Sequence, residues 1–358
     1  MRIFLISNMY PSSKDALFGV FVKNFRAELE KQGVHFSKLA LIKGKAYSPI
    51  KKIFNYLLHY GRILVLSLSK EYDLIYVHYL SHHIPVLFPI ALLSKKPLVI
   101  NIHGSDLIGW DKKPIFRFFT KKILERCRLL VVPTVYFKDT VLEMYPSLSV
   151  DQIYVSPSGG IDRSIFYHKE EPSKESSICL GFVSRFIAEK GWQTFLESLI
   201  KLRAENIPFK ALMAGKGPDE LKIRDFISTQ GLEKSVDFIG LVPQSKLVDV
   251  YNQLDLYIFP TYRAAESLGL TGLEAMSCGV PVVGCNIAGP STYIKNGYNG
   301  FFFEAKNADD LFNCIRDYFY LNEIDKKLLS QNAVQTAVAY DKTVVAENLL
   351  VRLKKIFS

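Results

Sequence analysis

Cysteine is scarce in this 358-residue sequence, and its spacing argues against the usual cysteine-based structures. The five cysteines are an odd number, and no two of them form a Cys-x-x-Cys pair. We therefore expect neither a disulfide framework nor a thiolate zinc site, and a reducing compartment fits best. The cysteines are Cys127, Cys179, Cys278, Cys285 and Cys314.

Long hydrophobic runs are also missing. Residues 84–93 are too short, and residues 53–68 contain His59 and Arg62, whereas a membrane span needs about 20 apolar residues. Residues 2–6 are apolar after Arg2, but this run is shorter than the core of a secretory signal. We therefore expect a cytoplasmic protein that is soluble or peripheral to a membrane.

Acidic residues are few in the first half of the chain. Residues 1–168 contain 23 Lys and Arg against 12 Asp and Glu, a net charge of +11, whereas residues 169–358 have a net charge of −1. This asymmetry indicates an anionic partner for the first half: a nucleic acid, a membrane surface or a phosphorylated substrate. No recognised nucleic-acid-binding motif accompanies the charge, so we expect no nucleic-acid partner.

Strand-length apolar runs alternate with helical patterns along the chain, which is typical of βαβ units around a parallel sheet. The polar residues 168–177 interrupt the alternation and read as a linker. We therefore predict two Rossmann-like α/β domains, residues 1–168 and 169–342, and a last helical segment, 343–358, that can pack on either. Strands are expected at residues 2–7, 73–77, 97–102, 128–132, 178–183, 209–213, 236–239, 256–259 and 280–283, and helices at 21–31 and 192–203.

The most informative segment, residues 266–283, follows a predicted strand. Gly269 and Gly272 open a helix there, and the free amides of a helix start attract an anion that small residues allow to approach. Glu266 precedes the helix, where a carboxylate suits sugar hydroxyls, and Glu274 lies inside it, where it suits ribose hydroxyls. The alternative is an ordinary helix with solvated glutamates.

Two cations form a second candidate site. Arg185 ends a buried strand and Lys190 precedes a helix, so both should emerge at the carboxyl edge of the sheet and meet a phosphate. Glu189 offers a local ion pair as the alternative. Two further strands end at Gly215, in a Gly-x-Gly turn, and at Ile239, whose apolar surroundings fit either a nucleotide base or plain core.

The first half offers two loops of the same kind. Gly19 lies between the first strand and the first helix, where it either faces a phosphate or simply starts the helix. His103 follows a buried strand in a His-Gly-x-Asp sequence, and Asp106 either belongs to the site or caps the next turn. A lone histidine is more often a satisfied hydrogen-bonding group, but its place at a strand end favours a functional role.

The glutamate pair with the E-x7-E spacing, followed by Ala-Met-x-x-Gly-x-Pro-Val-Val, resembles the retaining glycosyltransferases of family 4. The resemblance covers nearly the full length and implies the GT-B fold, in which two Rossmann-like domains face each other across a cleft. It also implies that the first domain binds the acceptor, that the second binds the donor, and that the last helix crosses back to the first domain.

The resemblance implies a role for each site residue. Glu266 would contact the donor sugar, Glu274 the ribose, Arg185 and Lys190 the diphosphate, and His103 both sugar and acceptor. The catalytic set is Glu266, His103, Arg185 and Lys190; the further donor contacts are Gly19, Gly215, Ile239, Leu268, Gly269, Leu270, Thr271 and Glu274; Asp106 lies on the acceptor side.

The expected activity is a retaining hexosyl transfer from a nucleotide-diphosphate sugar, UDP being favoured, to a glycan acceptor on a lipid carrier. Surface polysaccharide synthesis, such as that of lipopolysaccharide or capsule, and peripheral binding to an anionic membrane fit this picture. No Asp-x-Asp follows a strand, so we expect no metal and no other cofactor. A nucleotide-sugar isomerase is the alternative, and it would need acid–base side chains flanking the sugar.

Overall fold

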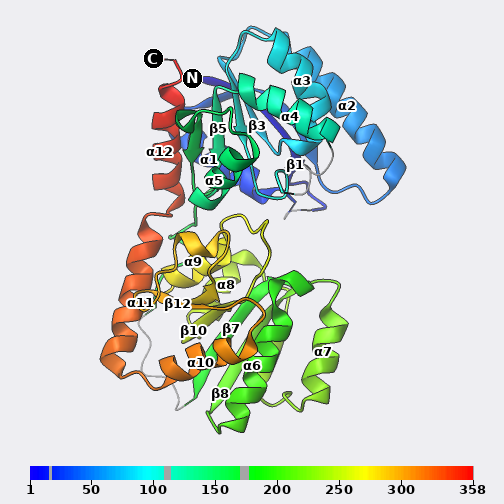
Figure 1. Cartoon of the computed structure of the whole chain (residues 1–358). Coiled ribbons are helices and arrows are strands. Elements are labelled where there is room, and N and C mark those ends of the chain that lie inside the picture. Colours follow the sequence, from blue (N-terminus) through cyan, green and yellow to red (C-terminus); the bar gives the residue numbers. More distant parts are fainter. Residues whose placement is uncertain (16–17, 109–113, 170–176, 358) are drawn as a thin grey trace. The chain divides into compact units, whose positions relative to one another are not determined.

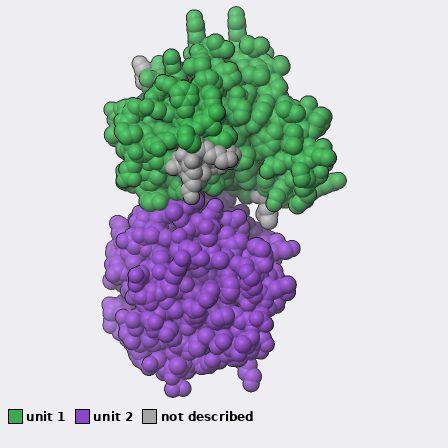
Figure 2. Space-filling model, turned by 45° about the vertical axis from the view of Figure 1, so that its right-hand side comes forward, with its two compact units in different colours: residues 1–160, 342–358 green, residues 161–341 purple. Residues whose placement is uncertain are grey.

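The computed structural model describes residues 1–15, 18–108, 114–169 and 177–357 and divides the chain into two compact units (Figures 1 and 2). Unit 1 contains residues 1–160 and 342–358, and unit 2 contains residues 161–341. The chain leaves unit 1 after Gly160, earlier than the expected residue 168, because Ile161 and Phe166 are buried in the core of unit 2. The expected linker falls largely on residues 170–176, outside the described part of the chain.

Unit 1 is built on a parallel sheet of six strands in the order β2-β1-β3-β4-β5-β6. Alternate residues of β1 point to opposite faces, so Phe4 and Ile6 join one core and Ile3 and Leu5 the other. The strands are β1 (Arg2–Tyr10), β2 (His35–Lys43), β3 (Leu74–His78), β4 (Leu98–Asn101), β5 (Leu129–Val132) and β6 (Ile153–Val155).

Helices cover both faces of this sheet, as a parallel sheet requires. Four helices pack on one face: α2 (Pro49–Ser67), α3 (Ile84–Leu93), α4 (Pro114–Arg126) and α5 (Val135–Met144). Two pack on the other: α1 (Val20–Lys31) and the last helix, α12 (Lys342–Lys354), whose Leu349 and Leu353 share a core with Val22. Short 3-10 turns are η1 (Ser81–His83) and η2 (Val150–Gln152).

Unit 2 repeats the plan, with a parallel sheet in the order β12-β11-β10-β7-β8-β9. Its strands are β7 (Ile178–Arg185), β8 (Phe209–Lys216), β9 (Val236–Gly240), β10 (Leu256–Phe259), β11 (Val282–Cys285) and β12 (Gly300–Phe303). One face carries α6 (Trp192–Ala204), α7 (Glu220–Thr229) and α10 (Ala308–Phe319). The other carries α8 (Leu247–Tyr251), α9 (Leu270–Ser277) and α11 (Glu323–Val338), and 3-10 turns lie at η3 (Ala188–Lys190), η4 (Gln244–Lys246) and η5 (Pro290–Thr292).

Each sheet has a point at which the chain changes direction across it. In unit 1 the neighbours of β1 are β2 and β3, and in unit 2 the neighbours of β7 are β8 and β10. At such a point the loops that follow two adjacent strands, β1 and β3 in unit 1 or β7 and β10 in unit 2, lead to opposite faces of the sheet. Ligands of open α/β sheets bind in the crevice between two loops of this kind.

No helix in the described part of the chain is both long enough and apolar enough to cross a bilayer.

Candidate active site

The first site in unit 2 lies where the loops after β7 and β10 meet. Lys190 ends η3, just before α6, and Glu266 lies in the loop between β10 and α9. Because β7 and β10 are hydrogen-bonded neighbours, their carboxyl ends bring the two side chains together, although they are far apart in the sequence.

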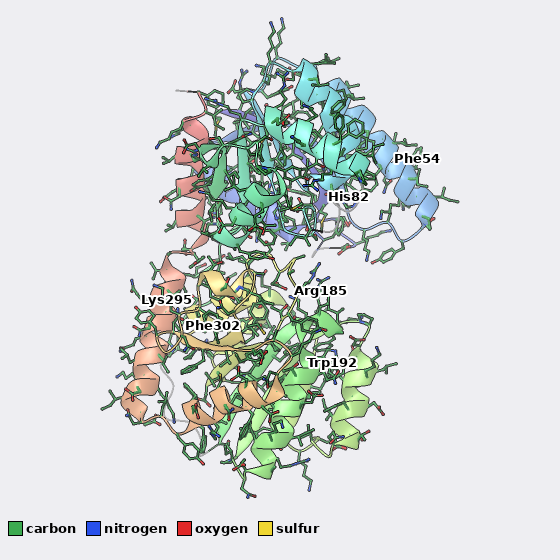
Figure 3. All side chains as sticks on the ribbon, viewed as in Figure 1. Phe54, His82, Arg185, Trp192, Lys295 and Phe302 are labelled. Atoms are coloured by element: carbon green, nitrogen blue, oxygen red, sulfur yellow. The ribbon has the colours of Figure 1, made fainter. Side chains whose placement is uncertain are left out.

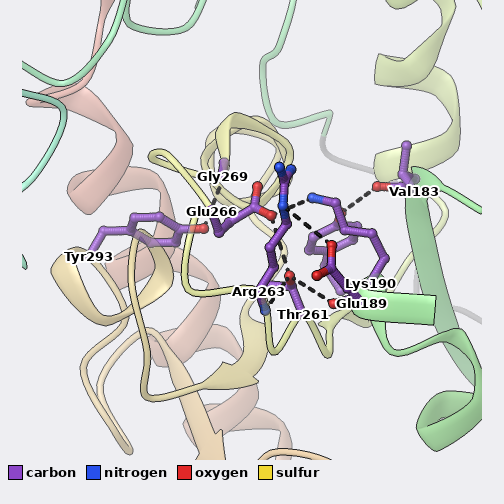
Figure 4. Close-up of polar contacts among 9 residues, drawn as sticks. Val183, Glu189, Lys190, Thr261, Arg263, Glu266, Gly269 and Tyr293 are labelled. Atoms are coloured by element: carbon purple, nitrogen blue, oxygen red, sulfur yellow. Dashed lines mark hydrogen bonds and ion pairs between the residues drawn. The ribbon is translucent and has the colours of Figure 1, made fainter. Parts of the chain in front are cut away.

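Lys190 and Glu266 form a buried ion pair, in which Nζ lies 2.5 Å from Oε2 (Figure 4). Thr261 Oγ1 donates to the same carboxylate oxygen at 3.3 Å, and the ammonium lies 5.5 Å from the centre of the Phe259 ring. A buried charge is costly unless it is paired and hydrogen-bonded, and here both conditions hold. The alternative of a solvated glutamate is therefore wrong for Glu266.

Burial lowers the pKa of Lys190, the Glu266 carboxylate opposes that shift, and the nearby cations Arg185 and Arg263 add to it. Glu189 pairs with Arg263, with Oε2 3.5 Å from Nε, whereas Lys190 pairs with Glu266. Arg185 is exposed at the end of β7 (Figure 3). Of these three cations, Lys190 and Arg263 face carboxylates, and Arg185 is exposed to solvent.

Helix α9 begins at Gly269, which adopts φ 77° and has no side chain to cap the helix. A Cβ there would lie 2.4 Å from Phe259 Cε1, so only glycine fits between the helix start and the strand. Tyr293 holds the turn by donating its hydroxyl to the Gly269 carbonyl at 3.0 Å. The first amides of α9, at Leu270 and Thr271, have no partner within the helix and are available to an anion.

Two other helices, α1 and α6, begin in the same way as α9. The helices after β1, β7 and β10 each begin with a left-handed glycine and lack a side-chain cap: Gly19 for α1, Gly191 for α6 and Gly269 for α9. Each helix thus presents bare amides at the carboxyl edge of its sheet, where an anion is favoured.

Glu274 lies inside α9 and is buried. Gln244 Nε2 donates to Oε1 at 3.0 Å, and the Tyr251 hydroxyl donates to Oε2 at 3.1 Å. Burial raises the pKa of this carboxyl, and the two donors oppose the shift. The carboxylate is held in one orientation, which is what recognition of a pair of hydroxyls requires.

The three remaining predicted donor contacts of unit 2 differ in their packing and exposure. Gly215 packs against the Ser184 carbonyl, where a Cβ would lie 1.8 Å from the oxygen, so close strand packing already requires glycine there. Ile239 is 45% exposed, which excludes a purely core role. Leu268 is buried beneath the start of α9.

In unit 1, Gly19 and His103 lie in one neighbourhood. Phe21, in the first turn of α1, contacts the His103 ring with 4.8 Å between ring centres. Asp106 is buried and accepts backbone hydrogen bonds from His103 at 2.8 Å and Leu80 at 3.0 Å. Asp106 therefore braces the loops after β3 and β4, and burial raises its pKa to about 6.

The sequence did not single out His78, which lies at the end of β3. Its Nδ1 is 2.9 Å from His103 Nε2, and its own Nε2 is buried without a partner. Burial lowers the pKa of His103 to about 3, so this ring is neutral at physiological pH. The pairing depends on the register of β3 against β4, in which His78 faces Asn101, and no local pattern reveals it.

The sequence patterns also failed to indicate three further residues near the site: Thr261, Arg263 and Tyr293. They come from the loops after β10 and β11 and contact the Lys190–Glu266 pair or the start of α9. A polar cluster straight after a buried strand was the signal available, since Thr261 and Arg263 follow β10 closely. Among the described residues, no three His, Cys, Asp or Glu side chains gather as metal ligands would.

Two family models match the chain, one after the other. Residues 19–161 match the family described as Glycosyltransferase Family 4, and residues 164–335 match Glycosyl transferases group 1. A relative of known name is the D-inositol 3-phosphate glycosyltransferase of Paenarthrobacter aurescens, 26% identical over 277 residues that cover 72% of this chain and 67% of the relative.

Solved structures agree on the fold. Sucrose-phosphate synthase from Thermosynechococcus elongatus matches with a TM-score of 0.78 and 18% identity, covering 100% of this chain and 99% of the other. HepE from Anabaena, solved in complex with UDP, matches with a TM-score of 0.76 and 16% identity, covering 99% and 100%. The chain therefore belongs to the family 4, group 1 glycosyltransferases, has the GT-B fold, and transfers a sugar from a nucleotide sugar.

Proposed function

We propose that the enzyme transfers a hexose from a UDP-sugar with retention of anomeric configuration. The observation that carries the proposal is the buried Lys190–Glu266 pair beside the uncapped start of α9. It sets a cation, a carboxylate and bare amides together at the point where a nucleotide-diphosphate sugar would lie. The UDP bound to HepE, a protein of the same fold, supports UDP as the nucleotide of the donor.

The residues suggest a front-face displacement. The bond from the anomeric carbon to the diphosphate oxygen breaks, the acceptor oxygen bonds to that carbon on the same face, and the acceptor proton passes to the leaving diphosphate. Lys190, Arg185 and the amides of α9 stabilise the charge that develops on the diphosphate. Glu266 orients the sugar by accepting hydrogen bonds from its hydroxyls, and Glu274 does the same for the ribose.

His103 is proposed to lie on the acceptor side with Asp106 behind it. Because the His103 imidazole is neutral, it can donate or accept a hydrogen bond without adding charge. His78 and Asp106 fix its position from two sides.

The proposed acceptor is a lipid-linked glycan, and the proposed role is in surface polysaccharide synthesis, such as lipopolysaccharide or capsule, at the cytoplasmic face of a membrane. The support is the charge distribution: the net charge of +11 lies in residues 1–168, which form most of unit 1. An anionic leaflet would attract such a unit.

A hydrolysis screen tests the donor and the metal requirement together. Without acceptor, UDP-, GDP- and ADP-sugars are compared by the nucleotide released, and UDP-sugars should be turned over fastest. EDTA should leave the rate unchanged, because protein cations and amides would stabilise the diphosphate. Full loss on chelation, restored by magnesium or manganese, would contradict a metal-independent mechanism; an inverted anomer in the product, read by NMR, would contradict retention.

A further inference from the structure

Helix α2 of unit 1 buries its polar and aromatic side. The Tyr56 hydroxyl accepts from Asn8 Nδ2 at 3.1 Å, and the Tyr60 hydroxyl donates to the His82 carbonyl at 2.6 Å. His59 is buried beneath the helix. These contacts fix the rotation of α2 about its axis, so the opposite side has no freedom to turn inward.

The opposite side of α2 is aliphatic and faces solvent. Its large side chains recur three or four residues apart, which places them on one face of a helix. We call this face the α2 stripe and define it by Ile50, Ile53, Phe54, Leu57 and Val65 of α2 with Leu68 just after it, which are 59% to 84% exposed. Figure 3 shows Phe54 pointing away from the body of unit 1. A surface helix ordinarily buries such a face, so the α2 stripe indicates a partner.

The charge around the stripe identifies the kind of partner. Residues 31–70 contain no Asp or Glu, and neither does α3, which contacts α2. Lys51 and Arg62 are eleven residues apart, close to three full turns, so both flank the stripe on the same side. From residue 43 to residue 70 the exposed cations are Lys43, Lys45, Lys51, Lys52, Arg62 and Lys70. Within α2 the charged residues beside the stripe are all cations, and an apolar stripe with such a border matches a bilayer leaflet with anionic headgroups.

A second basic group of the sequence, Lys113, Arg117 and Lys121, falls just before and within α4. Lys113 lies outside the described residues. Arg117 donates to the Met144 carbonyl at 3.2 Å, and Lys121 lies 3.8 Å from Glu125, which also pairs with a neighbouring lysine. The cations of α4 are therefore partly engaged within the protein.

We propose that the α2 stripe inserts into an anionic leaflet, with α2 parallel to the membrane plane and Lys51 and Arg62 at the level of the headgroups. Any catalytic benefit rests on the proposed lipid-linked acceptor, whereas the insertion itself rests on the surface of unit 1. The probe is phosphatidylcholine vesicles with and without phosphatidylglycerol, and the readout is flotation of the full chain.

The wild-type chain should float with phosphatidylglycerol vesicles and much less with neutral ones. The double variant Leu57→Ser/Val65→Ser should lower the partition coefficient by at least about tenfold, because two exposed aliphatic groups no longer enter the leaflet. Lys51→Ser should weaken binding most at low salt. The matched control is Leu221→Ser/Ile324→Ser on unit 2, where both residues are 80% exposed or more, and it should bind like the wild type.

Equal flotation of the Leu57→Ser/Val65→Ser variant and the wild type would overturn the proposal, as would equal binding to neutral vesicles. A dimer that the stripe variant abolishes, without lipid binding by the wild type, would identify a second copy as the occupant and also overturn it. Donor hydrolysis without lipid should be unchanged in the variant. Failure of the wild type to hydrolyse any donor would count against the proposed function and not against insertion.

Discussion

The Lys190–Glu266 pair is the residue-scale feature on which the site depends. Burial disfavours the charged form of Lys190, and the Glu266 carboxylate, 2.5 Å from the ammonium, favours that charged form. In a buried pair each charge is stable only in the presence of the other, so removing one partner is costlier than replacing both.

A double-mutant cycle tests this coupling. Lys190→Met and Glu266→Gln should each lower the free energy of unfolding by up to about 3–5 kcal/mol, because each leaves an unpaired group in a buried site. The double variant should lose much less than the sum of the two. Denaturant unfolding measures all four proteins, and additive losses would contradict a coupled buried pair.

Substitutions of Glu274 and of Glu266 should differ in their effect on the affinity for the free nucleotide. Glu274→Gln should weaken binding of free UDP by about 1–3 kcal/mol, because it loses charge-assisted hydrogen bonds to the ribose. Glu266→Gln should spare UDP affinity, since its proposed contact is the sugar, while both variants lower turnover by orders of magnitude. Calorimetry with free UDP distinguishes them, and equal losses of affinity would disprove the division of roles.

At the scale of elements, the glycine that starts α9 sets where its first amides lie. Its left-handed backbone turns the chain sharply out of the loop, and the lack of a Cβ allows the helix to approach Phe259. The two constraints can be distinguished, because Gly297 shares the positive φ, at 71°, yet has no atom within 4 Å of a Cβ.

Gly269→Ala and Gly297→Ala therefore make a matched pair. Both place an L side chain at positive φ, which costs about 1–2 kcal/mol of stability. Only Gly269→Ala also displaces the start of α9, and it should weaken UDP-sugar binding by at least about tenfold. Thermal unfolding and calorimetry measure the two effects; similar donor affinity in both variants would show that the α9 amides do not bind the donor.

At the scale of the whole molecule, acid should weaken the protein through unit 1. Burial lowers the pKa of His59 to about 4 and that of His83 to about 3, and His78 and His103 shift the same way. An unfolded histidine takes up its proton near pH 6.5. Between that pH and the folded values the unfolded state binds more protons, so stability falls as the pH decreases.

Each such histidine should contribute a slope of about 1.4 kcal/mol per pH unit below pH 6.5. Asp106, with its pKa raised to about 6, and Glu274, with its pKa also raised by burial, act in the opposite direction, because a raised pKa stabilises the folded state at low pH. They are two groups against five histidines, since burial lowers the pKa of His82 as well. Calorimetric scans at several pH values, with His59→Asn for comparison, check this. The variant should show a shallower dependence on pH, and an unchanged slope would contradict it.

Local patterns in the sequence determined much of the fold. Buried central strands such as β1, β4, β7 and β10 read as apolar runs because both of their faces are covered. The strands that escaped prediction were β2, β6 and β12, and each is an edge strand that pairs on one side only. Their residues are partly exposed, as the burial pattern of β2 shows, so their apolar signal is diluted.

Local patterns also predict where the proposed donor site lies, since the E-x7-E spacing and the helix-opening glycines are local features of the sequence. Which side chains pair depends on the tertiary structure. Lys190 meets Glu266 and His78 meets His103 because adjacent parallel strands end side by side, and strand order is a long-range property. Which side of α2 faces solvent also depends on contacts with residues far away in the sequence. A helical period places Leu57 and Val65 on one face, but the polar contacts of Tyr56 and Tyr60 with distant residues turn that face to solvent.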